Sequence, residues 1–161
     1  MRSLIAETFP DTDFADSYCT IPTVIPQRTF LEKAFLLHEE FQKPLDKIRA
    51  DRMSRHIYDL EKLMDTSFAF DALGNKDLYD MIVEHRRTLT SMKEVDYTTH
   101  APETINFVPP AAVMAAWKKD YEIMQGYMIY GKSLSFDKLI ERIKELNERF
   151  NNMQLKSNAL I

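Results

Sequence analysis

Polar residues at helical spacing make segment 51–65 the first candidate for chemistry. Arg52, His56 and Asp59 lie at positions i, i+4 and i+7, so a helix here would place their side chains on one face. That face would span about 10 Å, the size of the sugar and phosphates of a nucleotide. The competing interpretation pairs Asp59 with Arg55 as a surface ion pair worth a few tenths of a kcal/mol. The spacing alone favours this ion pair.

Residues 126–133, GYMIYGKS, match the letters of the phosphate-loop pattern G-x-x-x-x-G-K-S. A phosphate loop follows a strand, whereas residues 117–124 are expected to be helical, and the four variable positions here hold bulky side chains. We therefore expect Gly131 to end a helix in the left-handed conformation and not to approach a phosphate.

Two further segments match known sites only in part. Residues 38–42, HEEFQ, begin like the zinc motif H-E-x-x-H but end in glutamine, so we expect His38 to be a hydrogen-bonded histidine of the core or its edge. Residues 84–87, EHRR, contain arginines able to bind phosphate, although such a short cluster is more often solvated surface. No other His, Cys or carboxylate set has a convincing ligand spacing, so no metal site is predicted.

The composition describes one globular domain. Of 161 residues, 45% are hydrophobic, enough for a folded core and too many for a disordered chain. The formal net charge of −4 argues against general binding to nucleic-acid backbones. The single cysteine, Cys19, excludes an internal disulfide and favours a cytoplasmic location. No apolar run is long enough for a signal peptide or a membrane span, so no membrane contact is expected.

The elements that must position the polar residues are helices. The chain has only 3 glycines, and this scarcity favours a mainly α fold of about five helices packed as a bundle. A capping box formed by Thr29 and Glu32 predicts the start of the first helix. The other helices are predicted over residues 51–65 and 76–92, from residues 109–110 onward, and after Ser135, where Phe136, Leu139, Ile140, Ile143, Leu146 and Phe150 form a buried stripe.

The remaining segments are predicted to be non-helical. Residues 19–25 look extended, and Pro22 confines them to the edge of a sheet. Residues 68–73 are expected to form a short apolar turn, and residues 93–109 a long loop or a short hairpin. The chain accordingly divides into residues 1–28, an extended connector with an edge strand, and residues 29–161, a helical domain.

Two sequence blocks resemble the C-terminal portion of the AbiEii/AbiGii abortive-infection nucleotidyltransferase toxins. The blocks are residues 26–41, PQRTFLEKAFLLHEEF, and residues 52–60, RMSRHIYDL, and the resemblance continues through 120–121, 128–131 and 134–136. It implies a toxin-antitoxin or phage-defence protein that transfers a nucleotide to an acceptor in a metal-dependent reaction.

The resemblance also implies roles for particular side chains. The lysine of the T-F-x-E-K block is Lys33, which would act as a point charge on the triphosphate, and the acidic residue of the D-L block is Asp59, which would orient the nucleotide or the acceptor. Arg52, Arg55 and His56 would join Lys33 in binding the nucleotide. Relatives often carry aspartate at the position of His56, where a neutral imidazole can still hydrogen-bond a nucleotide hydroxyl.

One part of the family's active site has no counterpart in this sequence. Family members begin with a strand-turn-helix that carries a Gly-Gly or Gly-Ser turn and then an Asp-x-Asp metal-binding pair. Here the first glycine is Gly74, and no glycine turn precedes residues 11–13, DTD. We therefore interpret the chain as the C-terminal part of a nucleotidyltransferase, inactive alone and without metal ligands of its own. Mg²⁺ and a nucleoside triphosphate are expected only for the intact enzyme.

This interpretation gives three candidate partners: an antitoxin protein, the missing N-terminal catalytic half, and a second copy of the chain. Nucleic acid would enter only as the nucleotide acceptor. The main alternative is a non-enzymatic helical interaction module that dimerises or binds a protein through its strand edge and apolar surface. A third interpretation, nucleic-acid binding through residues 85–87, predicts a steep dependence of affinity on salt.

Overall fold

The computed structural model describes residues 21–153 of the chain, so residues 11–13 and the first two residues of the predicted edge strand lie outside the described residues. The described range contains six α-helices: α2 (Pro26–Phe41), α3 (Ser54–Leu63), α4 (Ser67–Gly74), α5 (Lys76–His85), α6 (Met114–Tyr127) and α7 (Phe136–Asn151). It contains no strand, which confirms the predicted mainly α class. Within residues 21–153, no helix combines the length and the apolar character that crossing a membrane requires.

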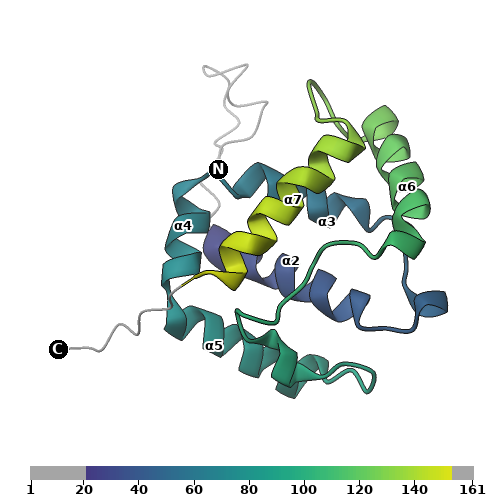
Figure 1. The fold of residues 1–161 in the computed structure, drawn as a ribbon. Coiled ribbons are helices and arrows are strands. Elements are labelled where there is room, and N and C mark those ends of the chain that lie inside the picture. Colours follow the sequence, from purple (N-terminus) through teal and green to yellow (C-terminus); the bar gives the residue numbers. More distant parts are fainter. Residues whose placement is uncertain (1–20, 154–161) are drawn as a thin grey trace, which may run out of the picture.

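Helix α2 lies at the centre of the bundle, with α3, α4 and α5 packed against it (Figure 1). Its fully buried side chains recur at one-, three- and four-residue intervals and so form a wide apolar stripe: Phe30, Leu31, Ala34, Phe35 and Leu37. Helix α7 packs against α3 and α6 and closes the core from the other side. This wide buried stripe makes α2 a rigid support for any site on its more exposed side.

The start of α2 differs from the prediction. The helix begins at Pro26, whose fixed φ suits the first helical position, and it has no side-chain cap. Glu32 accepts a hydrogen bond from Arg28 Nε at 2.8 Å, so the predicted capping box of Thr29 and Glu32 is wrong. Residues 21–25 are exposed and belong to no strand, so this part of the predicted edge strand is also wrong. A strand needs a neighbour, and the described range offers none.

Helix α7 confirms the predicted stripe. All six of its predicted apolar residues are buried, and Ser135 is the N-cap residue, although its side chain makes no cap hydrogen bond. Phe150 packs against Phe30 at a ring-centroid distance of 5.6 Å and edge-on against Phe107 at 5.0 Å. The aromatic cluster therefore joins the last helix to the first one described.

The predicted turn at residues 68–73 is instead helix α4, which buries Ala69 and Ala72. Small side chains allow α4 to pack closely on α2, a tertiary contact that the local sequence does not reveal. Asn75 then separates α4 from α5, because its side-chain oxygen caps α5 by accepting from Leu78 N at 3.0 Å. The helical path of α5 continues through a π-helical turn at residues 86–90.

Residues 93–109 form a loop and not a hairpin, with a short 3₁₀ turn at Tyr97–His100. Side chains from helices hold this loop in place. Asn147 of α7 accepts from Phe107 N at 2.9 Å, and Tyr79 of α5 donates its hydroxyl to the carbonyl of His100 at 2.6 Å. These bonds tie the loop to α7 and α5.

The segment that matched the phosphate-loop pattern has a different structure. Gly126 lies inside α6, which ends at Tyr127, so residues 126–133 do not form a phosphate-binding loop. Gly131 does have a positive φ of 102°. It lies in the turn between α6 and α7, beyond the helix C-cap Met128, so the prediction that it directly ends the helix is wrong.

Candidate nucleotide-binding site

Helices α2 and α3 bring together the two residues that the resemblance assigns to the active site. Lys33 Nζ lies 2.7 Å from Asp59 Oδ2, and the two side chains are 22% and 41% exposed. The charged ends are therefore shielded but reachable from solvent. The competing prediction, that Asp59 pairs with Arg55, is wrong. Within residues 21–153, the ion-pair partner of Asp59 is Lys33.

A hollow of about 200 Å³ opens beside this ion pair. Its lining comes from α2, α3 and the π-helical turn: Thr29, Glu32, Lys33, Leu36, His56 and Arg86. Lys33 contributes three N–H donors, of which one faces Asp59. The hollow can therefore offer hydrogen-bond donors to an anionic group of phosphate size.

His56 lies at the edge of the hollow as a neutral side chain. Burial lowers its pKa to about 4, and the charge of Lys33 adds to the shift, so the imidazole carries no charge at pH 7. Its Nδ1 is buried and has no hydrogen-bond partner among residues 21–153. Such an imidazole can exchange a hydrogen bond with a ligand but adds no positive charge.

Arg52 and Arg55 do not share the hollow with Lys33. Arg52 precedes α3 and has a positive φ of 56°, so the predicted helical line from Arg52 to Asp59 is wrong at its first residue. Both arginines line a separate hollow of about 60 Å³ together with Asp120 of α6. The Nε of Arg55 is buried there without a hydrogen-bond partner in the described part of the chain.

Asp120 is a structural residue of the site that sequence reasoning missed. Its carboxylate accepts from the backbone N–H of Arg52 at 2.7 Å and of Ser54 at 2.9 Å, and also from the hydroxyl of Ser54. These donors lie at the start of α3 and in the turn just before it, so Asp120 acts as an N-cap supplied by another helix. The only sign of its importance in the sequence was that the resemblance continues through residues 120–121. That resemblance did not indicate which residues Asp120 would bond.

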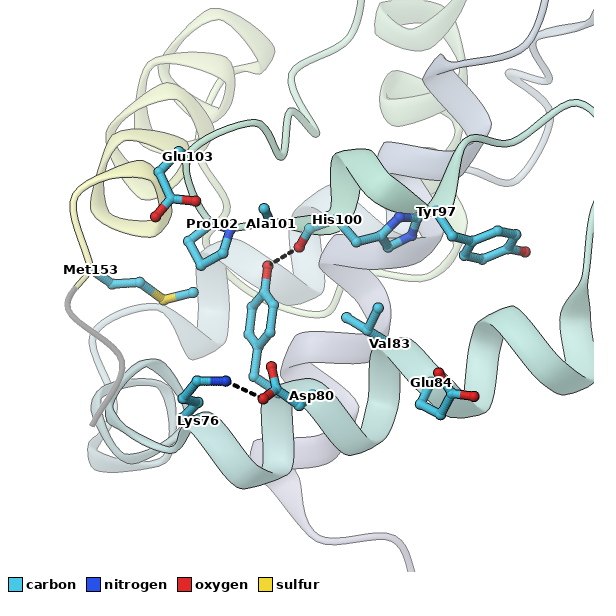
Figure 2. Close-up of a pocket in the computed structure, with 11 residues that line it drawn as sticks. Lys76, Asp80, Val83, Glu84, Tyr97, His100, Ala101, Pro102, Glu103 and Met153 are labelled. Atoms are coloured by element: carbon cyan, nitrogen blue, oxygen red, sulfur yellow. Dashed lines mark hydrogen bonds and ion pairs between the residues drawn. The ribbon is translucent and has the colours of Figure 1, made fainter. Parts of the chain in front are cut away.

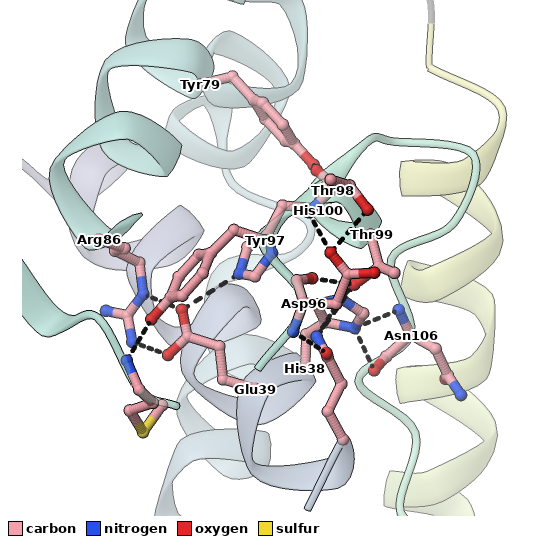
Figure 3. Close-up of polar contacts among 12 residues, drawn as sticks. His38, Glu39, Tyr79, Arg86, Asp96, Tyr97, Thr98, Thr99, His100 and Asn106 are labelled. Carbon is pink, nitrogen blue, oxygen red and sulfur yellow. Dashed lines mark hydrogen bonds and ion pairs between the residues drawn. The ribbon is translucent and has the colours of Figure 1, made fainter. Parts of the chain in front are cut away.

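Residues 84–87 were predicted to be solvated surface, but the side chain of Arg86 is largely buried. Its Nε lies 2.6 Å from Oε1 of Glu39, and its Nη2 lies 2.5 Å from Oε2 of the same fully buried carboxylate (Figure 3). Burial alone would raise the pKa of Glu39, but hydrogen bonds from Arg86 and His100 outweigh burial and hold this pKa below its usual value. Arg87 and Glu84, in contrast, are exposed, as expected of a solvated cluster, and they form an ion pair with each other.

His38 is buried and hydrogen-bonded, as predicted. Its Nδ1 accepts from Asn106 N at 3.0 Å, and its Nε2 lies 2.9 Å from Thr99 Oγ1 (Figure 3). Burial is the main reason why its pKa is below the ordinary value. His38 therefore fastens the 93–109 loop to α2 and has no free nitrogen for a ligand.

The described residues do not fit a magnesium ion. Residues 21–153 contain no group of three His, Cys, Asp or Glu side chains arranged to hold a metal. We therefore derive no metal-dependent step from this part of the chain.

Lys33 and Asp59, the two residues that the resemblance assigns to the active site, thus meet on two packed helices. Residues 2–142 match the family described as nucleotidyl transferase AbiEii toxin, Type IV TA system. The chain belongs to this family, which confirms the resemblance seen in its sequence blocks. No curated protein and no solved structure matches the chain.

Proposed function

We propose that this chain provides the nucleotide-binding part of a nucleotidyltransferase toxin, which transfers a nucleotide to an acceptor. The observation that carries the proposal is the 2.7 Å contact between Lys33 and Asp59. These residues come from separate blocks of the sequence, and family membership gives both blocks a nucleotidyltransferase context.

The hollow beside Lys33 suits the phosphates better than the whole nucleotide. Its volume of about 200 Å³ is below the ~300 to 1,000 Å³ of pockets that enclose a complete small ligand. In our proposal, Lys33 holds a phosphate in the hollow, while the base and sugar extend over its rim. His56 would then hydrogen-bond a nucleotide hydroxyl, and Asp59 would orient the nucleotide or the acceptor.

Arg52 and Arg55 have a secondary place in the proposal, because they line the other hollow. They would contact a nucleotide only where it crosses the first turn of α3.

Mg²⁺ would need acidic ligands from outside residues 21–153, and it would supply charge stabilisation for the transferred group. We accordingly propose that the chain binds a nucleoside triphosphate but needs a complementary catalytic half for transfer. The candidate partners remain that half, an antitoxin and a second copy of the chain, and the proposed setting is phage defence in the cytoplasm.

Nucleotide binding can be tested by adding each of the four ribonucleoside triphosphates to the ¹⁵N-labelled chain and following its amide resonances. We expect shifts at Lys33 and His56, and Lys33→Ala should weaken binding by about ten-fold, as for loss of one charge-assisted contact. Lys76→Ala is the matched control, since Lys76 also pairs with an aspartate, Asp80, but on α5. Equal affinity of Lys33→Ala and the unmodified chain would contradict the proposal.

Transfer needs a separate assay with the intact protein, including any catalytic segment encoded with it. Metal-dependent labelling of an acceptor should be lost in both Lys33→Ala and Asp59→Ala. Labelling that survives both substitutions would show that this ion pair has no part in the reaction.

One observation favours the alternative function of an interaction module. Apolar side chains are exposed at the end of α6 and in the following turn, at Ile123, Tyr127, Met128 and Tyr130. The alternative predicts no dependence on nucleotides. Sedimentation of the chain, with and without Tyr127→Ser and Met128→Ser, would show whether this patch holds two copies together.

A further inference from the structure

A larger hollow lies away from Lys33, between α5 and the loop that follows Tyr97. Its volume is about 600 Å³, within the range of small-ligand pockets. Figure 2 shows α5 along one side, the segment from Tyr97 to Glu103 along the other, and Met153 at one end. Neither the family description nor the proposed nucleotide site gives this pocket a role.

The charged side chains that line the pocket are mostly acidic. Asp80, Glu84 and Glu103 contribute three carboxylates, and Lys76 is the one lysine or arginine in the lining. Lys76 is already paired with Asp80, and no ion pair is present for Glu103 within residues 21–153. Arg87, which is not part of the lining, pairs with Glu84 at 2.8 Å, so Glu103 supplies the negative charge that is left, and this charge disfavours a nucleotide and favours a cation.

The hydrogen-bonding groups that line the pocket also favour a cation. Lys76 Nζ and the Tyr79 hydroxyl, both donors, are engaged by Asp80 and by the His100 carbonyl. His100 is 1% exposed and directs Nε2 at the acceptor-only carboxylate of Glu39, at 3.1 Å. In the neutral ring, Nδ1 is then an acceptor, and it has no partner in the described part of the chain. The Glu103 carboxylate and this ring nitrogen are both hydrogen-bond acceptors, so a ligand must supply the donor.

Aromatic rings complete the lining. The ring of Tyr97 stacks on that of His100, with centroids 5.0 Å apart and planes 16° apart, and Tyr79 lies in the opposite wall. Aromatic faces beside carboxylates attract organic cations, especially planar guanidinium groups. We propose that this pocket binds a guanidinium or primary ammonium group carried on an apolar body.

The charge requirement can be tested with two ligands of equal shape. Butylguanidinium carries the cation, and butylurea is its neutral counterpart. In titrations of the ¹⁵N-labelled chain, we expect butylguanidinium to shift the amides of Val83, Tyr97 and Glu103, and butylurea to leave them nearly unchanged. Equal shifts with both ligands, or no shifts at these amides with butylguanidinium, would overturn the proposal.

Variants test the position of the site. Glu103→Gln removes a charge without removing an ion pair that we observe, and it should weaken butylguanidinium binding by about three-fold, as for one partly screened charge contact. Glu122→Gln, on the exposed surface of α6, is the control and should bind normally. Unchanged affinity in Glu103→Gln, with the fold checked by circular dichroism, would contradict the assignment.

The same pocket could receive a free amine or a side chain of another protein. Agmatine represents the first source, and the capped peptide acetyl-Gly-Arg-Gly-amide represents the second. Tighter binding of agmatine would support a small cation, and tighter binding of the peptide would support an arginine of a protein. Failure of both to bind would overturn the proposal, and neither result depends on nucleotide binding at Lys33.

Discussion

Each positively charged residue around the α2–α3 hollow has a carboxylate of its own. Lys33 pairs with Asp59, and Arg86 pairs with Glu39. His56 adds no charge at pH 7, because its pKa is about 4. An anionic ligand must therefore compete with Asp59 for the Lys33 ammonium. The partial exposure of Lys33 and Asp59 makes this exchange feasible, whereas the pair of Arg86 and buried Glu39 is fixed.

The neutral state of His56 predicts a dependence of stability on pH. Its pKa in the folded protein lies below the usual 6.5, so the unfolded chain binds more protons between pH 6.5 and 4. Stability is therefore present above pH 6.5 and is lost as the pH falls. From pH 7 to 5 we expect His56 to account for a loss of about 2 kcal/mol in the free energy of unfolding. Urea unfolding at several pH values would measure it.

The control for this prediction is His56→Asn. His38 also has a lowered pKa, caused first by burial, and so it contributes a loss in the same direction. The variant should keep the His38 contribution and lose that of His56, which gives a flatter curve between pH 7 and 5. Identical curves for the variant and the unmodified chain would show that His56 titrates normally in the folded state.

At the scale of elements, the position of α3 depends on α6. Asp120 receives hydrogen bonds from the backbone N–H of Ser54, the first residue of α3, and from that of Arg52, which lies just before the helix in the left-handed conformation. Because α3 carries Asp59 and His56, the α6 contact helps to set where these side chains face α2. The nucleotide-binding proposal thus depends on a residue outside the hollow.

We expect Asp120→Ala to lower the free energy of unfolding by about 2 kcal/mol, since it removes a helix cap and leaves backbone donors without partners. Thermal unfolding followed by circular dichroism would measure the loss. Asp137→Ala is the control, because Asp137 is largely exposed and lies 3.9 Å from Lys118. A loss no larger than that of the control would show that the cap has little effect.

The helices could be predicted wherever burial repeats along the local sequence, as it does in α7 from Phe136 to Phe150. Helix α4 was missed because its packing depends on small side chains facing α2, a contact that leaves no periodic signal. Family resemblance named Lys33 and Asp59, but only tertiary packing shows that they touch. The same packing separates Arg52 and Arg55 from them, which linear spacing could not reveal.

For the whole molecule, the buried carboxylate of Glu39 joins parts that are distant in sequence. It belongs to α2 and binds Arg86 of the π-helical turn and His100 of the 97–100 turn (Figure 3). Arg86 lines the hollow beside Lys33, and His100 lines the proposed cation pocket. One buried group therefore fixes a wall of each hollow.

Loss of this carboxylate should destabilise the entire fold. In Glu39→Gln, the guanidinium of Arg86 loses its counter-ion in a site where only 13% of its side chain is exposed, so we expect a loss of about 3 kcal/mol in urea unfolding. Glu94→Gln, which breaks an exposed pair with Lys47, should cost much less. The double variant Glu39→Gln/Arg86→Gln should be more stable than the sum of the two single losses predicts, because it leaves no unpaired buried charge. Additive losses would mean that Glu39 and Arg86 act independently, and the network would then not be what holds the two hollows in place.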